Sequence, residues 1–346
     1  MTQTLEAPTY HHASSPEEDA LAIINAYRDE MGEAFNVRPL DEEFAFFAHK
    51  VGASGLYLAD AADNHARTFK WRGALNKMAH LHMEDKSAVA LLPSAGNHLR
   101  GGVMAGKVLN MPVYGVVPKS APLEKREGAR ELWPDGGMFR LRVVGKDFTE
   151  AKAWAEENAH LGTLVPPYDD PEVAAGQGTL ADDIYQEFQR MDVRLDRVVV
   201  PVGGGGLFAG LAKRFYQLDP HVTIDGIEAE GSNSLSRSQE AGELRNADKP
   251  NKRYGGSAVS LTGEHTFKTY NEQSNMQLWQ VKDAEVEEFV EDYLAERQYR
   301  ELRHTPFEPT TLVAVAGLQK IAQRHPGQTV AVVGTGRNDA PEAIWR

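Results

Sequence analysis

The sequence contains no cysteine, and this absence excludes three kinds of site. Disulfide frameworks, zinc centres built on thiolates and cysteine nucleophiles all require that residue. No stretch approaches the roughly 20 consecutive apolar residues of a membrane-spanning helix, and the N-terminus does not have the charged and then apolar pattern of a secretory signal. We therefore expect a cytoplasmic, soluble protein.

Basic residues are also too few for a general nucleic-acid-binding surface. Asp and Glu number 50 against 37 Lys and Arg, which gives a formal net charge of −13 at pH 7. Nucleic-acid binding depends on Lys and Arg that neutralise phosphates. The 346 residues, 41% of them hydrophobic, suffice for one large domain or two smaller ones. We expect a small-molecule partner, with no nucleic-acid or membrane partner.

Strands and helices alternate along most of the chain. Strands separated by helices with short polar turns indicate a parallel sheet covered on both faces, so the expected fold class is α/β. Residues 1–15 are polar and without a period, which is typical of a loose arm. We predict strands at 55–58, 88–92, 113–117, 138–143, 162–165, 197–202 and 330–333, and helices at 16–31, with Ser15 as the cap, and at 71–81, 100–109, 122–132, 148–161, 178–191 and 207–218.

One lysine, Lys70, stands at the start of the helix predicted over 71–81. Apolar residues recur along one face of that helix, at Ala74, Leu75, Met78 and Leu81. Most lysines at such a place are solvated surface charges. If the rest of the chain supplies a phosphate-binding loop and an apolar pocket, a desolvated lysine amine can instead form a Schiff base with a carbonyl cofactor.

Four consecutive glycines, Gly203–Gly206, join a predicted buried strand to a helix. Such a turn lets several main-chain N–H groups point at one anion, aided by the positive end of the helix. The run matches neither of the common nucleotide-binding glycine patterns. A merely flexible turn is the alternative, but four glycines cost conformational entropy unless the backbone needs them. The glycine run therefore predicts a phosphate-binding loop.

Two further segments lie where ligands bind in open α/β sheets. Ser94–His98 links a strand to a helix, where its polar groups could hold a carboxylate, although an ordinary helix cap is as good an interpretation. The strand at 330–333 carries Thr335 to the carboxyl edge of the sheet. A common turn hydroxyl is the alternative there.

In this order and spacing the segments resemble the pyridoxal-phosphate enzymes of the tryptophan synthase β-like fold, or fold type II, and within them the threonine/serine dehydratase group. Thr68–Ala74 is similar to the family's Ser-Phe-Lys-x-Arg-Gly-Ala motif around the Schiff-base lysine. Ser94–His98 matches its Ser-Ala/Ser-Gly-Asn-His loop, and Gly203–Leu207 matches its phosphate loop. Shorter matches, Glu308-Pro309 among them, extend the resemblance from about Arg38 to the C-terminus.

The resemblance implies the architecture and the cofactor. We expect two lobes, each with a mostly parallel sheet flanked by helices. Residues 1–63 and 166–346 would form a large cofactor-binding domain, and residues 64–165 a small mobile domain that closes over the site. The cofactor would be pyridoxal 5'-phosphate, and the protein a homodimer.

The resemblance also implies a role for each matched residue. Lys70 would hold the cofactor as a Schiff base and, once released, remove the substrate Cα proton. Main-chain amides would bind the phosphate, Asn97 the ring hydroxyl and Thr335 the pyridine nitrogen, with Phe69 packed near the ring. The expected cofactor-binding residues are thus Lys70, Phe69, Asn97, Gly203, Gly204, Gly205, Gly206, Leu207 and Thr335. The expected substrate-binding residues are Thr68, Ser94, Ala95, Gly96, Asn97 and His98.

The expected reaction is α,β-elimination on a β-hydroxy amino acid such as threonine or serine, giving a 2-oxo acid and ammonia. A neutral hydroxyl at Thr335 does not keep the pyridine nitrogen protonated, so the ring is a weaker electron sink and β-elimination or β-replacement is favoured over transamination. Ala95 stands where racemases of the family carry a serine, which favours dehydration over racemisation. A β-replacement synthase and a cofactor-binding protein without catalysis are the alternatives.

Several residues depart from the family pattern and leave the substrate open. Leu58–Arg67 replaces a Lys-x-Glu-rich strand and a Thr-Gly turn, Trp71 replaces a small aliphatic residue, and Gly334–Asn338 replaces Ser-Gly-Gly-Asn. Serines follow Glu228 where some relatives have an aspartate, so we expect no obligatory metal and a paired or solvated Glu228. Because the chain ends soon after Thr335, we expect no appended regulatory domain.

Overall fold

The structure is a computed structural model that describes residues 15–51, 55–134, 137–300 and 305–345. The loose arm expected over residues 1–15 lies outside this part of the chain, except for Ser15. Ser15 caps the first helix, α1 (Pro16–Tyr27), because its hydroxyl accepts a hydrogen bond from the Glu18 main-chain N–H. Among the described helices, none is both long enough and apolar enough to cross a membrane.

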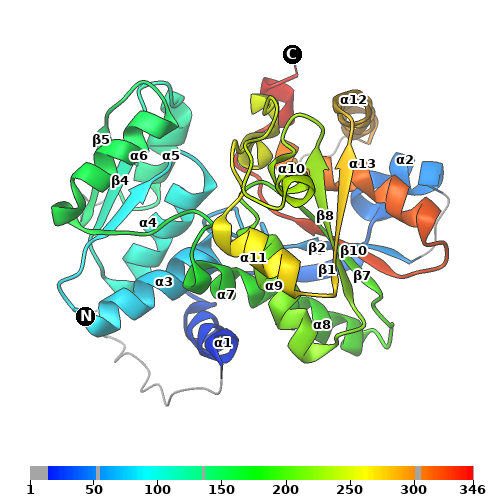
Figure 1. The fold of residues 1–346 in the computed structure, drawn as a ribbon, viewed down its shortest axis with the longest axis horizontal. Coiled ribbons are helices and arrows are strands. Elements are labelled where there is room, and N and C mark those ends of the chain that lie inside the picture. Colours follow the sequence, from blue (N-terminus) through cyan, green and yellow to red (C-terminus); the bar gives the residue numbers. More distant parts are fainter. Residues whose placement is uncertain (1–14, 52–54, 135–136, 301–304, 346) are drawn as a thin grey trace.

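Two sheets organise the chain into two lobes (Figure 1). The larger sheet has the order β1-β2-β10-β7-β8-β9, and all neighbours are parallel except β1 and β2. Its strands are β1 (Asn36–Pro39), β2 (Leu56–Asp60), β7 (Arg197–Pro201), β8 (Thr223–Ala229), β9 (Met276–Val281) and β10 (Val330–Gly334). The smaller sheet, order β5-β4-β3-β6, is entirely parallel and comprises β3 (Ala90–Pro93), β4 (Val113–Val117), β5 (Phe139–Val143) and β6 (Thr163–Leu164).

Helices surround both sheets. Those of the small lobe are α3 (Trp71–Glu84), α4 (Asn97–Leu109), α5 (Leu123–Glu131) and α6 (Phe148–Glu157). Those of the large lobe are α2 (Asp41–Val51), α7 (Pro171–Gly178), α8 (Leu180–Arg190), α9 (Gly206–Leu218), α10 (Ser234–Ala241), α11 (Glu264–Glu272), α12 (Asp283–Tyr299) and α13 (Pro309–Arg324). Short 3-10 helices lie at Ala159–Leu161, Lys252–Ser257 and Pro341–Ala343. The expected α/β class with parallel-dominated sheets is confirmed.

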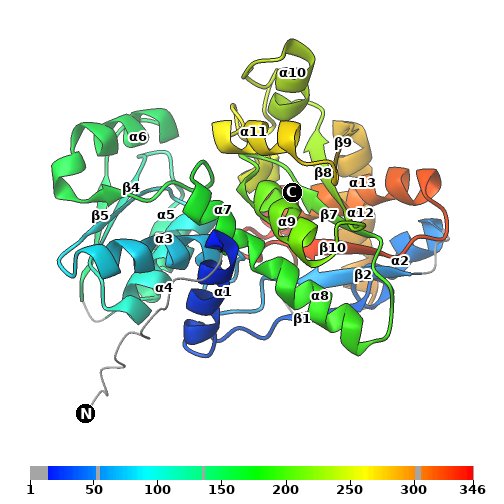
Figure 2. The ribbon, with the colours of Figure 1, turned by 60° about the horizontal axis from the view of Figure 1, so that its bottom comes forward.

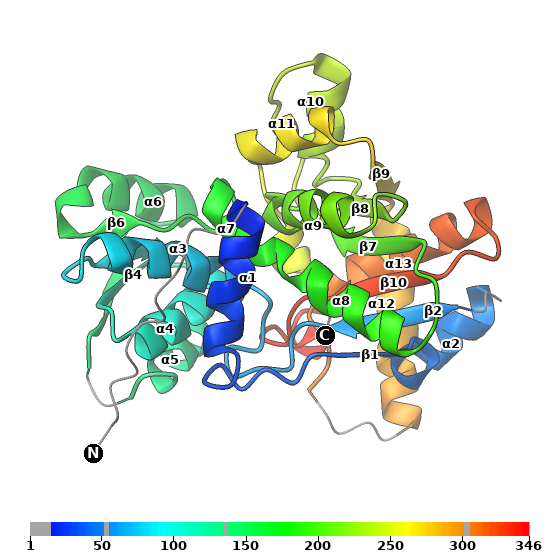
Figure 3. The same cartoon turned by 90° about the horizontal axis from the view of Figure 1, so that it is seen from below.

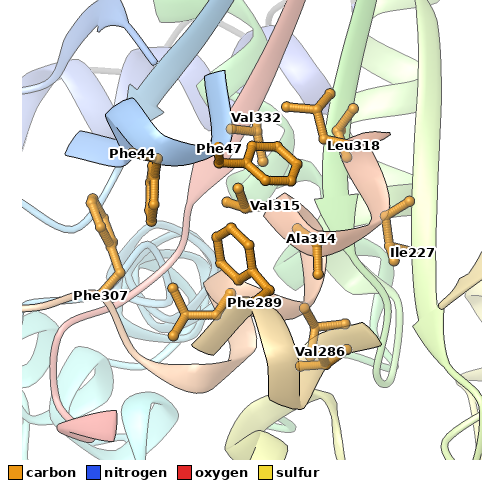
Figure 4. Packing of buried hydrophobic residues seen from close by; sticks show 14 of the residues in the cluster. Phe44, Phe47, Ile227, Val286, Phe289, Phe307, Ala314, Val315, Leu318 and Val332 are labelled. Atoms are coloured by element: carbon orange, nitrogen blue, oxygen red, sulfur yellow. The ribbon is translucent and has the colours of Figure 1, made fainter. Parts of the chain in front are cut away.

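The large sheet has a separate hydrophobic core on each face. Helices α2, α12 and α13 cover one face, where Phe44, Phe47 and Phe289 pack against Val315 of α13 (Figure 4). Helices α8 and α9 cover the other face, so that the strands lie between α9 and α13 (Figure 2). A core buried on both sides explains the nearly unbroken apolar runs of β7 and β10.

Helix α3, which begins directly after Lys70, connects the lobes. It packs against α4 within the small lobe and against α7 and α1, which lie beside it (Figure 3). Ala74, Leu75 and Met78 are fully buried, as their spacing predicts. The small sheet falls within the segment 64–165, whereas the exact division into a fixed and a mobile domain stays a prediction.

Candidate active site

The side chain of Lys70 lies at the junction of the two lobes. Lys70 is the residue directly before α3, and its Nζ donates a hydrogen bond to the main-chain oxygen of Pro167, 2.7 Å away. The same nitrogen lies 5.2 Å from the centre of the Phe69 ring. Desolvation lowers the pKa of the Lys70 amine to about 8, and the nearby Glu308 carboxylate partly opposes this shift. The amine is therefore far more often neutral near pH 7 than a surface lysine would be.

Thr335 is hydrogen-bonded to the segment before Lys70. The main-chain oxygen of Thr335 accepts hydrogen bonds from the Phe69 N–H at 3.1 Å and from the Thr68 hydroxyl at 3.3 Å. The Thr335 hydroxyl lies 3.0 Å from the hydroxyl of Thr311 on α13, and both are buried. Thr335 thus presents a neutral hydroxyl at the carboxyl edge of the large sheet, as its place in the sequence predicts.

The glycine run between β7 and α9 is held in place by hydrogen bonds to the Gly204 carbonyl. The Gly204 oxygen accepts hydrogen bonds from the Gly263 N–H and from the hydroxyls of Thr262 and Thr266. Within the described part of the chain, the main-chain N–H groups of residues 203–207 have no acceptor. Buried main-chain donors are almost always paired, so a row of free ones beside a helix N-terminus is an anion-binding arrangement.

The backbone at the glycine run could not accommodate larger residues. Gly205 adopts a φ of +86°, and a Cβ there would collide with the Thr266 side chain. A Cβ on Gly204 would collide with the ring of Tyr168, and one on Gly206 would lie 2.9 Å from the Tyr168 oxygen. Because Pro167 binds Lys70, the segment Pro167-Tyr168 joins the lysine to the glycine run.

Asn97, the first residue of α4, bridges the lobes through its amide. Its Nδ2 donates to the two carboxylate oxygens of Glu308, at 2.7 and 2.8 Å, and its Oδ1 accepts from Nδ2 of Asn338 at 2.8 Å. Glu308 is buried as the residue before α13. Desolvation and the neighbouring Asp339 raise the pKa of Glu308 to about 7, while Asn97 and Lys125 oppose the shift.

The remaining residues of the Ser94–His98 loop form the start of α4. The Ser94 hydroxyl accepts a weak hydrogen bond from the Gly96 N–H at 3.4 Å, and a Cβ on Gly96 would meet no atom within 4 Å. The buried His98 ring donates from Nε2 to the Val165 oxygen at 2.8 Å, since a carbonyl can only accept. Desolvation and the Lys70 charge lower the pKa of His98 to about 3, so the ring is neutral.

The first turn of α3 is tied to the rest of the protein by a buried ion cluster. Arg72 donates to Glu33 at 2.7 and 2.8 Å, to the Thr179 hydroxyl at 3.0 Å and to Asp183. Burial alone would lower the pKa of the Arg72 guanidinium, but Asp183 and Glu33 together raise it. The helix that follows Lys70 is thereby fixed to α8 and to the segment after α1.

Glu228 is paired. Its oxygens accept from the Leu235 N–H at 2.7 Å and from the Ser236 N–H and hydroxyl at 3.0 and 2.6 Å, so the carboxylate caps the start of α10. Burial raises the pKa of Glu228 against these hydrogen bonds. In the described residues no group of three His, Asp or Glu side chains is arranged to hold a metal ion.

Sequence reasoning did not single out four residues that complete the arrangement. Tyr168 lies against the glycine run, and Thr311 lies beside the Thr335 hydroxyl. Asn338 and Glu308 form hydrogen bonds with the Asn97 amide. Glu308 stands out in the sequence only as part of a short family match. Its place directly before Pro309, at a helix start, was the available signal.

Comparison with known proteins identifies relatives over most of the chain. The model of the family "Pyridoxal-phosphate dependent enzyme" matches residues 39–336. An L-threo-3-hydroxyaspartate ammonia-lyase of a Pseudomonas species is 31% identical over 306 residues, which cover 88% of each chain. A biosynthetic L-threonine dehydratase of Pasteurella multocida is 34% identical over 275 residues, 78% of this chain, but the match spans only 50% of that longer protein.

A solved structure agrees with these sequence matches. The processed form of threonine deaminase isoform 2 from Solanum lycopersicum superposes with a TM-score of 0.77 at 28% sequence identity, covering 94% of this chain and 90% of that one.

Proposed function

Because the chain belongs to the family of pyridoxal-phosphate dependent enzymes, we propose that it is an ammonia-lyase that eliminates water from a β-hydroxy amino acid, after which water adds back to the enamine product and ammonia is released. The substrate would be an amino acid such as threonine or serine, and the product a 2-oxo acid. The hydroxyl at Thr335 in place of a carboxylate supports elimination, and so do the names of the relatives, which include a threonine dehydratase and a hydroxyaspartate ammonia-lyase.

The residues present fit the cofactor. A phosphate needs converging hydrogen-bond donors, and the N–H groups of residues 203–207 are free to donate. A carbonyl carbon needs an amine that is partly neutral, and the lowered pKa of Lys70 provides one.

When bound, pyridoxal phosphate supplies a carbonyl carbon for the substrate amine and a conjugated ring that stabilises negative charge at the substrate Cα. Lys70 would hold the cofactor through its Nζ. Once freed by the substrate amine, the same Nζ would act as the general base toward the Cα proton, for which a pKa of about 8 is well suited.

The other residues bind and orient. Main-chain N–H groups of Gly203–Leu207 would hold the phosphate, and Asn97 would hold the ring hydroxyl. Thr335 would bind the pyridine nitrogen, and Phe69 would pack beside the ring. The residues that would line the place of the substrate carboxylate are Thr68, Ser94, Ala95, Gly96, Asn97 and His98. The methyl group of Ala95 offers no second base, so the Cα proton is not returned from the opposite side.

The experiment is to incubate the purified protein separately with L-serine, L-threonine and L-threo-3-hydroxyaspartate, and to measure 2-oxo acid and ammonia. We expect both products in equal amounts from at least one amino acid, and none from the Lys70→Ala variant. Lys70→Ala should also lose the visible absorption band of the protein-bound cofactor. If the band is present but none of the three amino acids alone gives a 2-oxo acid, elimination on these substrates is wrong. A different substrate, a β-replacement reaction and a cofactor-binding protein without catalysis are then the alternatives.

Assembly and location belong to the same proposal. We place the protein in the cytoplasm as a homodimer, with residues 64–165 as the domain that closes over the substrate. Light scattering that gives the mass of a monomer would refute the homodimer. Solution scattering that detects no compaction on adding substrate would refute closure.

A further inference from the structure

Two residues with no assigned role, Glu308 and Asn338, contact the amide of Asn97 from opposite sides. Asn97 lies on the small lobe, at the start of α4. Glu308 precedes α13 and Asn338 follows β10, so both partners belong to the large lobe. The amide of Asn97 is thus one of the points at which the small lobe meets the carboxyl edge of the large sheet.

The orientation of the Asn338 amide is fixed by main-chain carbonyls. Its Nδ2 donates to the Ala66 oxygen at 3.0 Å and to the Arg67 oxygen at 3.1 Å. Carbonyl oxygens accept and never donate, so the NH2 side of Asn338 has to face them. The same Nδ2 lies 2.8 Å from Asn97, whose nearest atom must therefore be the accepting Oδ1.

The orientation of the Asn97 amide follows from both neighbours. With Oδ1 turned to Asn338, the NH2 group is turned to the Glu308 carboxyl group, whose two oxygens accept from it. The two hydrogens of an amide nitrogen point in divergent directions, so one carboxylate bound at 2.7 and 2.8 Å takes one hydrogen and leaves the second. These hydrogen bonds can all form in only one orientation of the Asn97 amide. They therefore decide which of its two ends is the oxygen and which is the nitrogen.

We propose that Glu308 and Asn338 are positioning residues that turn the Asn97 amide so that it offers an N–H, rather than a carbonyl oxygen, to the hydroxyl of the cofactor ring. This rests on the assignment of Asn97 to that hydroxyl under the proposed function. A donor stabilises the ring oxygen as an anion, whereas an accepting oxygen would require the ring oxygen to keep its proton. The two positioning residues therefore set the protonation state of the bound ring.

Burial makes this control effective. Glu308 is 2% exposed, and the charged groups that act on it are Asp339, which forms a 2.8 Å ion pair with Lys125, and Lys70. None of these makes a hydrogen bond to the Asn97 amide. Only Glu308 and Asn338 hold its orientation among the described residues.

The test is the absorption spectrum of the cofactor bound to the protein. The ratio of its long-wavelength to its short-wavelength band reports whether the ring oxygen is ionised, and it does not require turnover. Asn97→Ala removes the amide, so it gives the largest change in the band ratio that loss of this hydrogen bond can cause. Glu308→Ala and Asn338→Ala should each lower the ratio, and the double variant should lower it about tenfold, the value of one hydrogen bond to a charged group. Glu308→Gln keeps an accepting oxygen and should restore most of the ratio.

The outcomes are distinguishable. If Asn97→Ala lowers the ratio but the Glu308 and Asn338 variants do not, the positioning roles are wrong while the proposed function stands. If Asn97→Ala also leaves the ratio unchanged, Asn97 does not bind the ring hydroxyl, and the inference fails with that assignment. If the wild type never shows a cofactor band, the proposed function fails first. Asp225→Asn, a buried carboxylate paired with Arg197 away from the site, is the matched control and should lower stability without changing the ratio.

Discussion

The amine of Lys70 lies 2.7 Å from the main-chain oxygen of Pro167, and this contact places the nitrogen in a desolvated position between two lobes. Desolvation disfavours the charged amine and lowers its pKa to about 8, against the usual value of 10.5. The Lys70 amine should therefore react as a nucleophile at a pH where surface lysines are still protonated.

Acylation of the cofactor-free protein tests this shift. An amine-reactive reagent should modify Lys70 with a midpoint near pH 8, because only the neutral amine is a nucleophile. Quantitative mass spectrometry between about pH 6 and pH 11 gives the midpoint, with exposed lysines such as Lys146 as internal references. Glu308→Gln should lower the Lys70 midpoint further, since the Glu308 carboxylate raises the pKa of Lys70. A midpoint shared with the exposed lysines would contradict the prediction.

Glu308 should make the free energy of unfolding depend on pH. Its pKa is about 7 when folded and near 4.5 when unfolded, so the folded state keeps a proton that the unfolded state loses. The stabilisation is complete below pH 4.5 and is lost as pH rises through 7, by on the order of 3 kcal/mol. Urea denaturation of cofactor-free wild type and Glu308→Gln from about pH 4.5 to pH 8 should reveal a difference that shifts in favour of the variant. A constant difference would refute the raised pKa.

Gly205→Ala should impair both folding and cofactor binding. The new Cβ meets the left-handed backbone at φ +86° and the Thr266 side chain, so we expect a loss of about 2–4 kcal/mol in unfolding free energy. Gly242→Ala is the matched control, because Gly242 has a φ of +70° but no atom within 4 Å of the position that a Cβ would take. It should cost about 1 kcal/mol and leave the dissociation constant for pyridoxal phosphate unchanged. Equal effects of the two substitutions would show that packing at the glycine run is unimportant.

At position 67, glycine should give a more stable protein than alanine. It adopts a φ of +55°, which a side chain disfavours, and its Nη2 donates to the Thr305 hydroxyl at 3.1 Å. Arg67→Gly and Arg67→Ala both remove that hydrogen bond, but only glycine relieves the backbone. We expect the glycine variant to be about 1 kcal/mol more stable than the alanine variant in thermal or urea unfolding. An alanine variant of equal or greater stability would exclude strain at this position.

Local patterns were sufficient to predict much of the fold. The α3 face, the glycine run and the strands β4 and β7 are encoded in short segments, and the structure has them where expected. Helix α7 was not predicted because Val173–Gly178 are all buried, so this part of the helix carries no alternation of polar and apolar residues. Its glycines serve close packing instead, since a Cβ on Gly176 would lie 2.6 Å from the Arg72 oxygen. Strand β1 was not predicted because Pro39 suggests the end of a regular element. Proline is nevertheless tolerated at the end of an edge strand.

Some residues of the candidate site could likewise be predicted from the sequence, and others could not. Lys70, Asn97 and Thr335 could be named from segments that carry their own pattern. Asn338 could not, and Glu308 could be named only as part of a short family match. Their significance lies in contacts with Asn97 across 241 and 211 positions of the chain. Such contacts depend on how the two sheets meet, which no local period records.

The buried cluster around Arg72 has a consequence for motion. Arg72 stands two positions after Lys70 and is tied to Glu33 and Asp183, which lie outside the segment 64–165. If that segment swings, it has to turn about the first turn of α3, because that turn cannot leave its partners without stranding buried charges. Lys70 then sits at the pivot, where displacement is smallest. The site would then open to admit its substrate while its reactive nitrogen stays in place.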